Sequence, residues 1–490
     1  MIRYIASDCD AVSIIHDAQG YAKTPEDAVA AVLKAGMDVN CGSYLQQHTK
    51  AAVDQKKITI PEIDRALHNL FSVRMRLGLF NGDPTGQQFG NIGPDQVCSQ
   101  ENQMLALDAA RDGIVLLKNS AGLLPLSESK TMSLAVIGPN ADSVQTLLGN
   151  YAGPPCKFVT PLRALQSYIK HTIPYPGCDS VQCSSASIDG AVNVAKGADH
   201  VVLLMGLDDT QEKEGLDRVD LVLPGKQEEL IISVAKAAKN PVVLVLLSGG
   251  PVDISFAKND RNIGSILWAG YPGEAGAIAL AEIIFGDHNP GELRKRLSQH
   301  IKIFVVLKLK YTLQCRREAT DDLAILGEHT DSTKAQLFFE FGYGLSYSKY
   351  TYELTAFSRN KLYLNQSSTK HKINNFDSVM SISVSELGTE FCEHNKFPVR
   401  IGVKNHGEMA GKHPVLLFAR QTKQGNGRAR KQLVGFHSVK LSAGERAEIE
   451  LEVSPCEHLS RANEDGLMVM EEGTHFLVVE DQEHPISIVI

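Results

Sequence analysis

Continuous apolar runs, separated by stretches with helical spacing, fill the middle of the chain. The apolar runs cover residues 134–137, 201–205, 242–247 and 263–268. Between and after them the spacing predicts helices near 188–195, 225–238 and 274–285. Strands that are apolar throughout are typical of a parallel sheet buried on both faces. We therefore predict a self-sufficient α/β sandwich domain over residues 131–292.

The last part of the chain alternates instead of running continuously apolar. Ala447, Ile449, Leu451 and Val453 are each separated by a charged residue, and residues 397–403 show the same alternation. A period of two indicates strands with one buried face. Strands of this kind over residues 376–490 predict a β-sandwich, with a linker expected at 339–375.

The first 82 residues read as short strands alternating with helices. Strands are expected at 3–7 and 37–39. A proline at the first helical position after Thr24 opens one helix, and Thr59 with Glu62 forms a capping box that opens another. Two β/α units of this size look like the last two of a parallel barrel, which needs about 250 residues when complete. Residues 83–130 are expected to be a linker.

Composition excludes several classes of protein. With 43% hydrophobic and 22% charged residues, the chain is expected to be soluble and globular. A net charge of −8 argues against a nucleic-acid partner. No run of 18 apolar residues is present, so we expect no membrane span, and Met1 leads directly into a strand, so no signal peptide is expected.

Residues 293–338 depart from this pattern. Eight Lys or Arg and no acidic residue lie within 294–317, in a chain that is acidic as a whole. We interpret this basic segment as a splicing or reading-frame artefact in preference to a functional patch. Cys315 lies inside it, so an even number of cysteines remains outside.

The cysteines and histidines predict no metal site. None of the nine cysteines forms a C-x-x-C pair, and the sixteen histidines show no helical His-x-x-x-His pair. No cofactor is expected either. Cys178 with Cys183, and Cys392 with Cys456, could form bridges, which would imply a secreted protein. From composition alone, buried free thiols in a cytosolic protein fit equally well.

Two acidic positions follow predicted strands. Asp8 follows the first strand, and the strand at 200–206 runs into a loop that contains Glu212 and Glu214. Loops at the carboxyl ends of strands carry the chemistry of open α/β sheets, and two carboxylates suffice to cleave a glycosidic bond. An alternative, the Asp-x-Asp motif of aspartate-phosphorylating phosphatases at Asp8 and Asp10, needs parallel strands directly afterwards, where residues 13–82 offer mainly helices.

Several short motifs, in this order along the chain, resemble glycoside hydrolase family 3, most closely its plant β-xylosidase/α-L-arabinofuranosidase branch. The matching segments are 7–12, 35–42, 112–119, 136–142, the Glu212 loop, 270–276 and 339–347. The resemblance implies a remnant of a (β/α)8 barrel, an α/β sandwich domain and a C-terminal fibronectin type III-like domain. Six further barrel units would be missing, so we expect the chain to be the C-terminal part of a longer enzyme.

The resemblance also implies roles for the acidic residues. Asp8 takes the position of the nucleophile, and Glu212, six residues after Gly206, takes that of the acid/base, with Glu214 as the alternative. In a retaining enzyme the two carboxyl groups lie about 5 Å apart. The acid must hold its proton near neutral pH, which burial or the charge of Asp8 would favour. Asp217 and Arg218 are interpreted as a structural ion pair.

The predicted function is that of a retaining exo-β-glycosidase that releases xylose or arabinose from xylan-type cell-wall oligosaccharides. The family resemblance favours secretion to the cell wall and bridged cysteines. The alternative is a non-catalytic remnant that at most binds carbohydrate, because two β/α units cannot close a barrel. The preferred sugar and the oligomeric state are not predicted.

Overall fold

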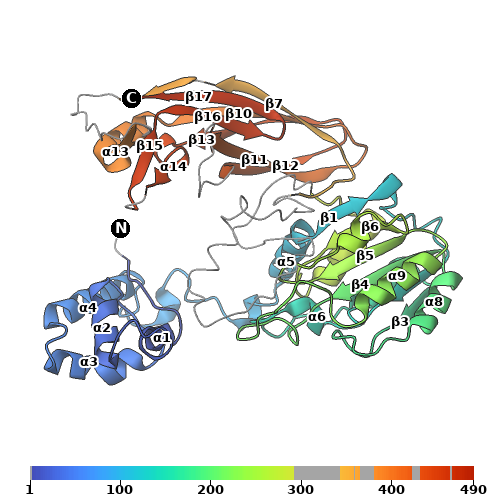
Figure 1. The fold of residues 1–490 in the computed structure, drawn as a ribbon, viewed down its shortest axis with the longest axis horizontal. Helices are drawn as coiled ribbons and strands as arrows, with labels where there is room; N and C mark the ends of the chain where they lie inside the picture. Colours follow the sequence, from blue (N-terminus) through green and yellow to red (C-terminus); the bar gives the residue numbers. More distant parts are fainter. Residues whose placement is uncertain (1–2, 292–342, 358, 365–379, 422–430, 464–465) are drawn as a thin grey trace. The chain divides into compact units, whose positions relative to one another are not determined.

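The structure is a computed structural model that describes the chain except for residues 1–2, 292–342, 358, 365–379, 422–430 and 464–465. The basic segment predicted at 293–338 lies outside the described residues. The described chain forms two compact units, Met1–Ser99 and Gln100–Ile490, which are considered separately (Figure 1).

The first unit is helical, with one pair of bridged strand residues. Its helices are α1 Ala11–Asp17, α2 Pro25–Lys34, α3 Tyr44–Asp54 and α4 Ile60–Arg76. Thr24 caps α2, and the capping box of Thr59 and Glu62 opens α4, as predicted. In place of the two predicted strands, the structure has a single parallel β-bridge between Ala6 and Val39.

A buried carboxylate, that of Asp38, connects the two segments that contain Ala6 and Val39. The side chain of Asp38 is 2% exposed. Its Oδ2 accepts a hydrogen bond from the amide of Ile5 at 3.0 Å, and Asn69 and Arg65 approach its Oδ1 at 3.1 and 3.6 Å. The carboxylate therefore ties the second segment to the first and to α4.

The second unit begins with a six-stranded sheet in the order β1-β6-β5-β4-β2-β3. The strands are β1 Val115–Asn119, β2 Leu134–Ile137, β3 Thr172–Tyr175, β4 His200–Gly206, β5 Val242–Leu247 and β6 Ile263–Trp268. All neighbouring strands pair in parallel except β1, which is antiparallel to β6. The four predicted strands are confirmed. The linker expected at 83–130 is wrong in part, because β1 and the helix α5 Gln100–Gly113 lie within it.

Helices cover both faces of this sheet (Figure 1). On β4, Val201, Leu203 and Met205 pack into one apolar cluster, while Val202 and Leu204 pack into a second cluster. Helices α8 Ile188–Gly197 and α9 Gln227–Ala237 cover the first face, whereas α5, α7 Pro161–Tyr168 and α11 Gly276–Phe285 cover the second. Burial on both faces explains why the strands are apolar throughout.

Two sheets, antiparallel except for the parallel pairing of the edge strand β8 with β17, form the predicted C-terminal β-sandwich around one apolar cluster. One sheet has the order β13-β10-β7 and the other β12-β11-β16-β17-β8. Their strands are β7 Tyr350–Phe357, β8 Lys361–Tyr363, β10 Phe397–Asn405, β11 Gly411–Gln421, β12 Gln432–Leu441, β13 Arg446–Val453, β16 Gly473–Val479 and β17 Gln482–Val489. The range predicted as a linker at 339–375 therefore supplies two strands of the sandwich.

Candidate active site

A tight strand end positions the Glu212 loop. Gly206, the last residue of β4, has φ 136°, and a Cβ there would lie 2.0 Å from the carbonyl oxygen of Leu247. The buried side chain of Gln227 accepts a hydrogen bond from the amide of Gly206 and donates one to its carbonyl, both at 2.9 Å. Only glycine allows this approach to β5, and Gln227 sets where the strand ends.

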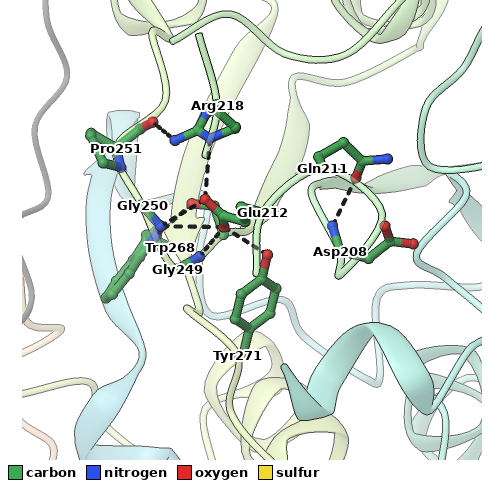
Figure 2. Close-up of polar contacts among 10 residues, drawn as sticks. Asp208, Gln211, Glu212, Arg218, Gly249, Gly250, Pro251, Trp268 and Tyr271 are labelled. Carbon is green, nitrogen blue, oxygen red and sulfur yellow. Dashed lines mark hydrogen bonds and ion pairs between the residues drawn. The ribbon is translucent and has the colours of Figure 1, made fainter. Parts of the chain in front are cut away.

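The carboxylate of Glu212 is surrounded by hydrogen-bond donors (Figure 2). Its Oε1 accepts from the amide of Gly249 at 2.7 Å and from the hydroxyl of Tyr271 at 2.7 Å. The amide of Gly250 lies 3.3 Å from both carboxylate oxygens. Nε of Arg218 lies 3.1 Å from Oε2. Every one of these partners donates to the carboxylate.

The sheet order brings these donors together. Glu212 follows β4, Gly249 and Gly250 follow β5, and Tyr271 follows β6, the three strands lying side by side. Their loops share the edge of the sheet where the strands end, which is the usual ligand site of an open α/β sheet. The resemblance pointed to Glu212, but sequence reasoning assigned no role to the two glycines or to Tyr271.

Burial and, secondly, the hydrogen bond to Glu212 raise the pKa of Tyr271 far above the ordinary value for tyrosine. The hydroxyl therefore stays neutral near neutral pH, and it acts as a donor to the carboxylate. Asp208, on the Glu212 loop, adds a smaller effect in the same direction.

Glu214 lies in a different environment from Glu212. Lys213 and Leu216 form a small antiparallel bridge, with Glu214 and Gly215 at its turn. The side chain of Glu214 is exposed, whereas that of Glu212 is only 15% exposed. The structure therefore gives different surroundings to Glu212, which the sequence favoured as the acid/base, and to its alternative Glu214.

The expected ion pair of Asp217 with Arg218 is wrong. Arg218 is directed towards Glu212, and its Nη2 donates to the carbonyl oxygen of Pro251 at 2.5 Å. Asp217 is exposed on the loop. A buried guanidinium finds a better partner in a buried carboxylate than in a neighbour exposed to solvent.

Asp8 is exposed and lies just past the bridged residue Ala6. Its Oδ1 accepts a hydrogen bond from the amide of Cys9 at 2.7 Å. A disulfide joins Cys9 to Cys41, with the Cα atoms 4.4 Å apart. The hydroxyl oxygen of Ser7 also accepts a hydrogen bond from the amide of Cys41 at 2.9 Å. The loop that carries Asp8 is thus tied to the loop after the neighbouring strand.

Two of the disulfides agree with pairs considered from the sequence, Cys178–Cys183 and Cys392–Cys456. The Cys9–Cys41 disulfide was not foreseen. Its signal was present, since each cysteine closely follows a short predicted strand. Asp8 and Glu212 belong to different units, so the separation of about 5 Å that retention requires stays a prediction.

Among the described residues, no group of three or more His, Cys, Asp or Glu could hold a metal ion. In the same part of the chain, no helix has both the length and the apolar character needed to cross a membrane.

Two family models match the chain. The glycosyl hydrolase family 3 C-terminal domain matches residues 114–347, and the fibronectin type III-like domain matches residues 413–483. The chain carries the C-terminal domain of glycosyl hydrolase family 3. The family and fold class predicted from the sequence are confirmed, and the first model begins at the sheet's first strand, β1.

Curated relatives cover nearly the whole chain. Probable beta-D-xylosidase 7 of Arabidopsis thaliana is 62% identical over 99% of the chain and 62% of its own length. Beta-xylosidase/alpha-L-arabinofuranosidase 1 of Medicago sativa subsp. varia is 40% identical over 99% of the chain and 61% of its own length. The chain thus spans about three fifths of the length of these relatives.

Solved structures agree with this relationship. An exo-beta-xylosidase of the same family, in complex with a xylobiose aziridine probe, superposes with a TM-score of 0.76 at 26% identity. The superposition covers 99% of this chain and 61% of the other. A beta-glucosidase from Listeria innocua, at 21% identity and a TM-score of 0.76, shares the fold.

Proposed function

We propose that this family 3 chain provides the two catalytic carboxylates of a retaining exo-β-glycosidase acting on xylan-type oligosaccharides. The observation that carries the proposal is the Glu212 carboxylate, held at the carboxyl ends of β4, β5 and β6 in a domain whose relatives are named as β-xylosidases. Xylose or arabinose is the expected product, and the cell wall the expected location.

In the first step, a carboxylate oxygen of Asp8 attacks the anomeric carbon while the carboxyl group of Glu212 donates its proton to the departing oxygen. The glycosidic bond breaks and a covalent glycosyl ester forms on Asp8. In the second step, the Glu212 carboxylate takes a proton from water, whose oxygen displaces Asp8 from the sugar. The configuration is retained because the anomeric carbon is inverted twice.

The surroundings of Glu212 support its assignment. Four donating groups, from Gly249, Gly250, Tyr271 and Arg218, fix the carboxylate at the edge of the sheet where β4, β5 and β6 end. Glu214 has no such setting, being exposed at a turn. We therefore assign the acid/base role to Glu212.

Substrates whose leaving groups differ in basicity test this assignment. Glu212→Ala should slow hydrolysis of a poor leaving group severely and spare the first step with an activated aryl xyloside. Added azide should then give a xylosyl azide of retained configuration, while Glu214→Ala should behave like the unmodified chain. The azide product from Glu214→Ala and not from Glu212→Ala would reverse the assignment. Carbohydrate binding without any turnover by residues 1–490 would favour the non-catalytic alternative.

A further inference from the structure

The donors around Glu212 form a site of their own, which we call the carboxylate nest: the amides of Gly249 and Gly250, the Arg218 guanidinium and the Tyr271 hydroxyl. Two amides come from consecutive glycines, and the charge comes from a guanidinium whose side chain is only 13% exposed. Consecutive amides beside a buried cation are a general arrangement for binding anions.

The two glycines are required by the close approach of the other groups. A Cβ on Gly250 would lie 2.9 Å from Oε2 of Glu212 and 2.8 Å from Nη2 of Arg218. On Gly249, it would lie 3.0 Å from the Tyr271 ring. Side chains at these positions would fill the space that the carboxylate occupies.

The nest also contains a hydrogen-bond donor that has no acceptor among the described residues. Nη1 of Arg218 is buried and makes no hydrogen bond within the described part of the chain. A buried donor without a partner is unfavourable, so the site favours a ligand with further acceptor capacity. The charged or titratable groups found around the carboxylate are Arg218, Tyr271 and, on the Glu212 loop, Asp208.

We propose that the nest is a binding site for small carboxylates, and that Glu212 occupies it as an internal ligand in a resting position. In this position every group of the nest donates to the carboxylate, so Glu212 must leave the nest to carry a proton to a leaving group. The second half of this inference rests on the proposed acid/base role, whereas the nest itself does not depend on that role.

Trp268 reports on the nest. It is the only tryptophan in the chain, it is 7% exposed, and its indole nitrogen donates to the hydroxyl of Ser248 at 3.0 Å. Ser248 directly precedes Gly249, and Figure 2 shows Trp268 beside this loop. A change of the ligand in the nest should therefore alter the tryptophan emission of the whole protein.

The experiment titrates sodium formate into residues 1–490 carrying Glu212→Ala, with emission at constant ionic strength and thermal unfolding as the two measurements. We expect a saturable change in emission and a rise in the unfolding midpoint with formate. Formamide, the neutral analogue, should give neither, and the unsubstituted chain should not respond because Glu212 fills the site. No saturable response in Glu212→Ala, or the same response in the unsubstituted chain, overturns the proposal.

Glu212→Gln keeps the inference testable if the alanine variant does not fold. Its amide NH2 would face donors, so we expect altered Trp268 emission and a lower unfolding midpoint, with no change in the matched variant Glu214→Gln. Emission and midpoint equal to those of the unsubstituted chain would contradict the nest. No glycosidase activity is measured, so failure of the nest and failure of the proposed function are distinguishable.

Discussion

Tyr271 donates its hydroxyl proton to Oε1 of Glu212 across 2.7 Å. The two residues are 59 positions apart in sequence and lie on loops that follow β6 and β4, with β5 between them in the sheet. The contact therefore exists only when the sheet has formed in this order. It links the candidate catalytic residue to a neutral donor buried beside it.

Removing this donor should weaken the fold measurably. Hydrogen bonds to charged groups contribute about 1.5–3 kcal/mol, against about 0.5–1.5 kcal/mol for neutral pairs. We expect Tyr271→Phe to lower the free energy of unfolding by the larger amount in urea titrations. Tyr175→Phe is the matched control, because its hydroxyl pairs with the neutral Ser187 at 2.7 Å. If the two variants lose equal amounts of unfolding free energy, the hydrogen bond from Tyr271 to Glu212 is no stronger than one between neutral groups.

Gln227 should control how the Glu212 loop leaves the sheet. Its buried amide satisfies both backbone groups of Gly206 and also donates to the carbonyl of Val181. Gln227→Leu leaves these groups unpaired, and each unpaired buried group costs about 1–3 kcal/mol. We expect a lower urea midpoint, with Glu228→Gln, an exposed neighbour on α9, unchanged. If the urea midpoint of Gln227→Leu equals that of the unsubstituted chain, the Gln227 hydrogen bonds to Gly206 and Val181 do not hold this strand end in place.

The Cys9–Cys41 disulfide should matter more for stability than Cys178–Cys183. The paired cysteines are 32 and 5 residues apart, and chain entropy predicts about 3.7 and 2.1 kcal/mol. We expect serine replacement of the first pair to expose residues 3–41 to limited proteolysis. Replacing the second pair should leave that region protected, and equal cleavage in both variants would refute a specific role for the first.

Acid should destabilise the sheet through His200. Burial lowers the pKa of His200, with Asp199 opposing the shift. The stability that the neutral ring contributes is therefore present above about pH 6.5 and is lost as pH falls through the lower folded value. We expect the urea midpoint to fall between pH 7 and 5, and less so in His200→Asn. Identical acid dependence would exclude His200, leaving His288, His458 and His484, whose pKa burial also lowers.

The central strands could be predicted because burial on both faces leaves a continuous apolar run. The run of β5, for example, has the predicted bounds. The edge strand β3 was missed, since it is short, partly exposed and interrupted by Pro174. The edge strand β1 was taken for linker, although it is apolar, because the pattern does not say which sheet a run joins.

The candidate site was predictable only in part, for a related reason. Glu212 stands in a motif that can be read along the chain. Its partners Gly249, Gly250 and Tyr271 belong to other loops, and only the order of β4, β5 and β6 places them beside it. The partner of Arg218 was misassigned because sequence neighbours were preferred over residues brought near by folding.

A mechanism-based label tests the central claim most directly. A 2-fluoro-xyloside with an activated leaving group should react with residues 1–490 and leave the sugar on the nucleophile, where peptide mass spectrometry can locate it. The account predicts an ester on Asp8 and no label in Asp8→Asn. A label on another residue, with xylosidase activity intact in Asp8→Asn, would contradict it.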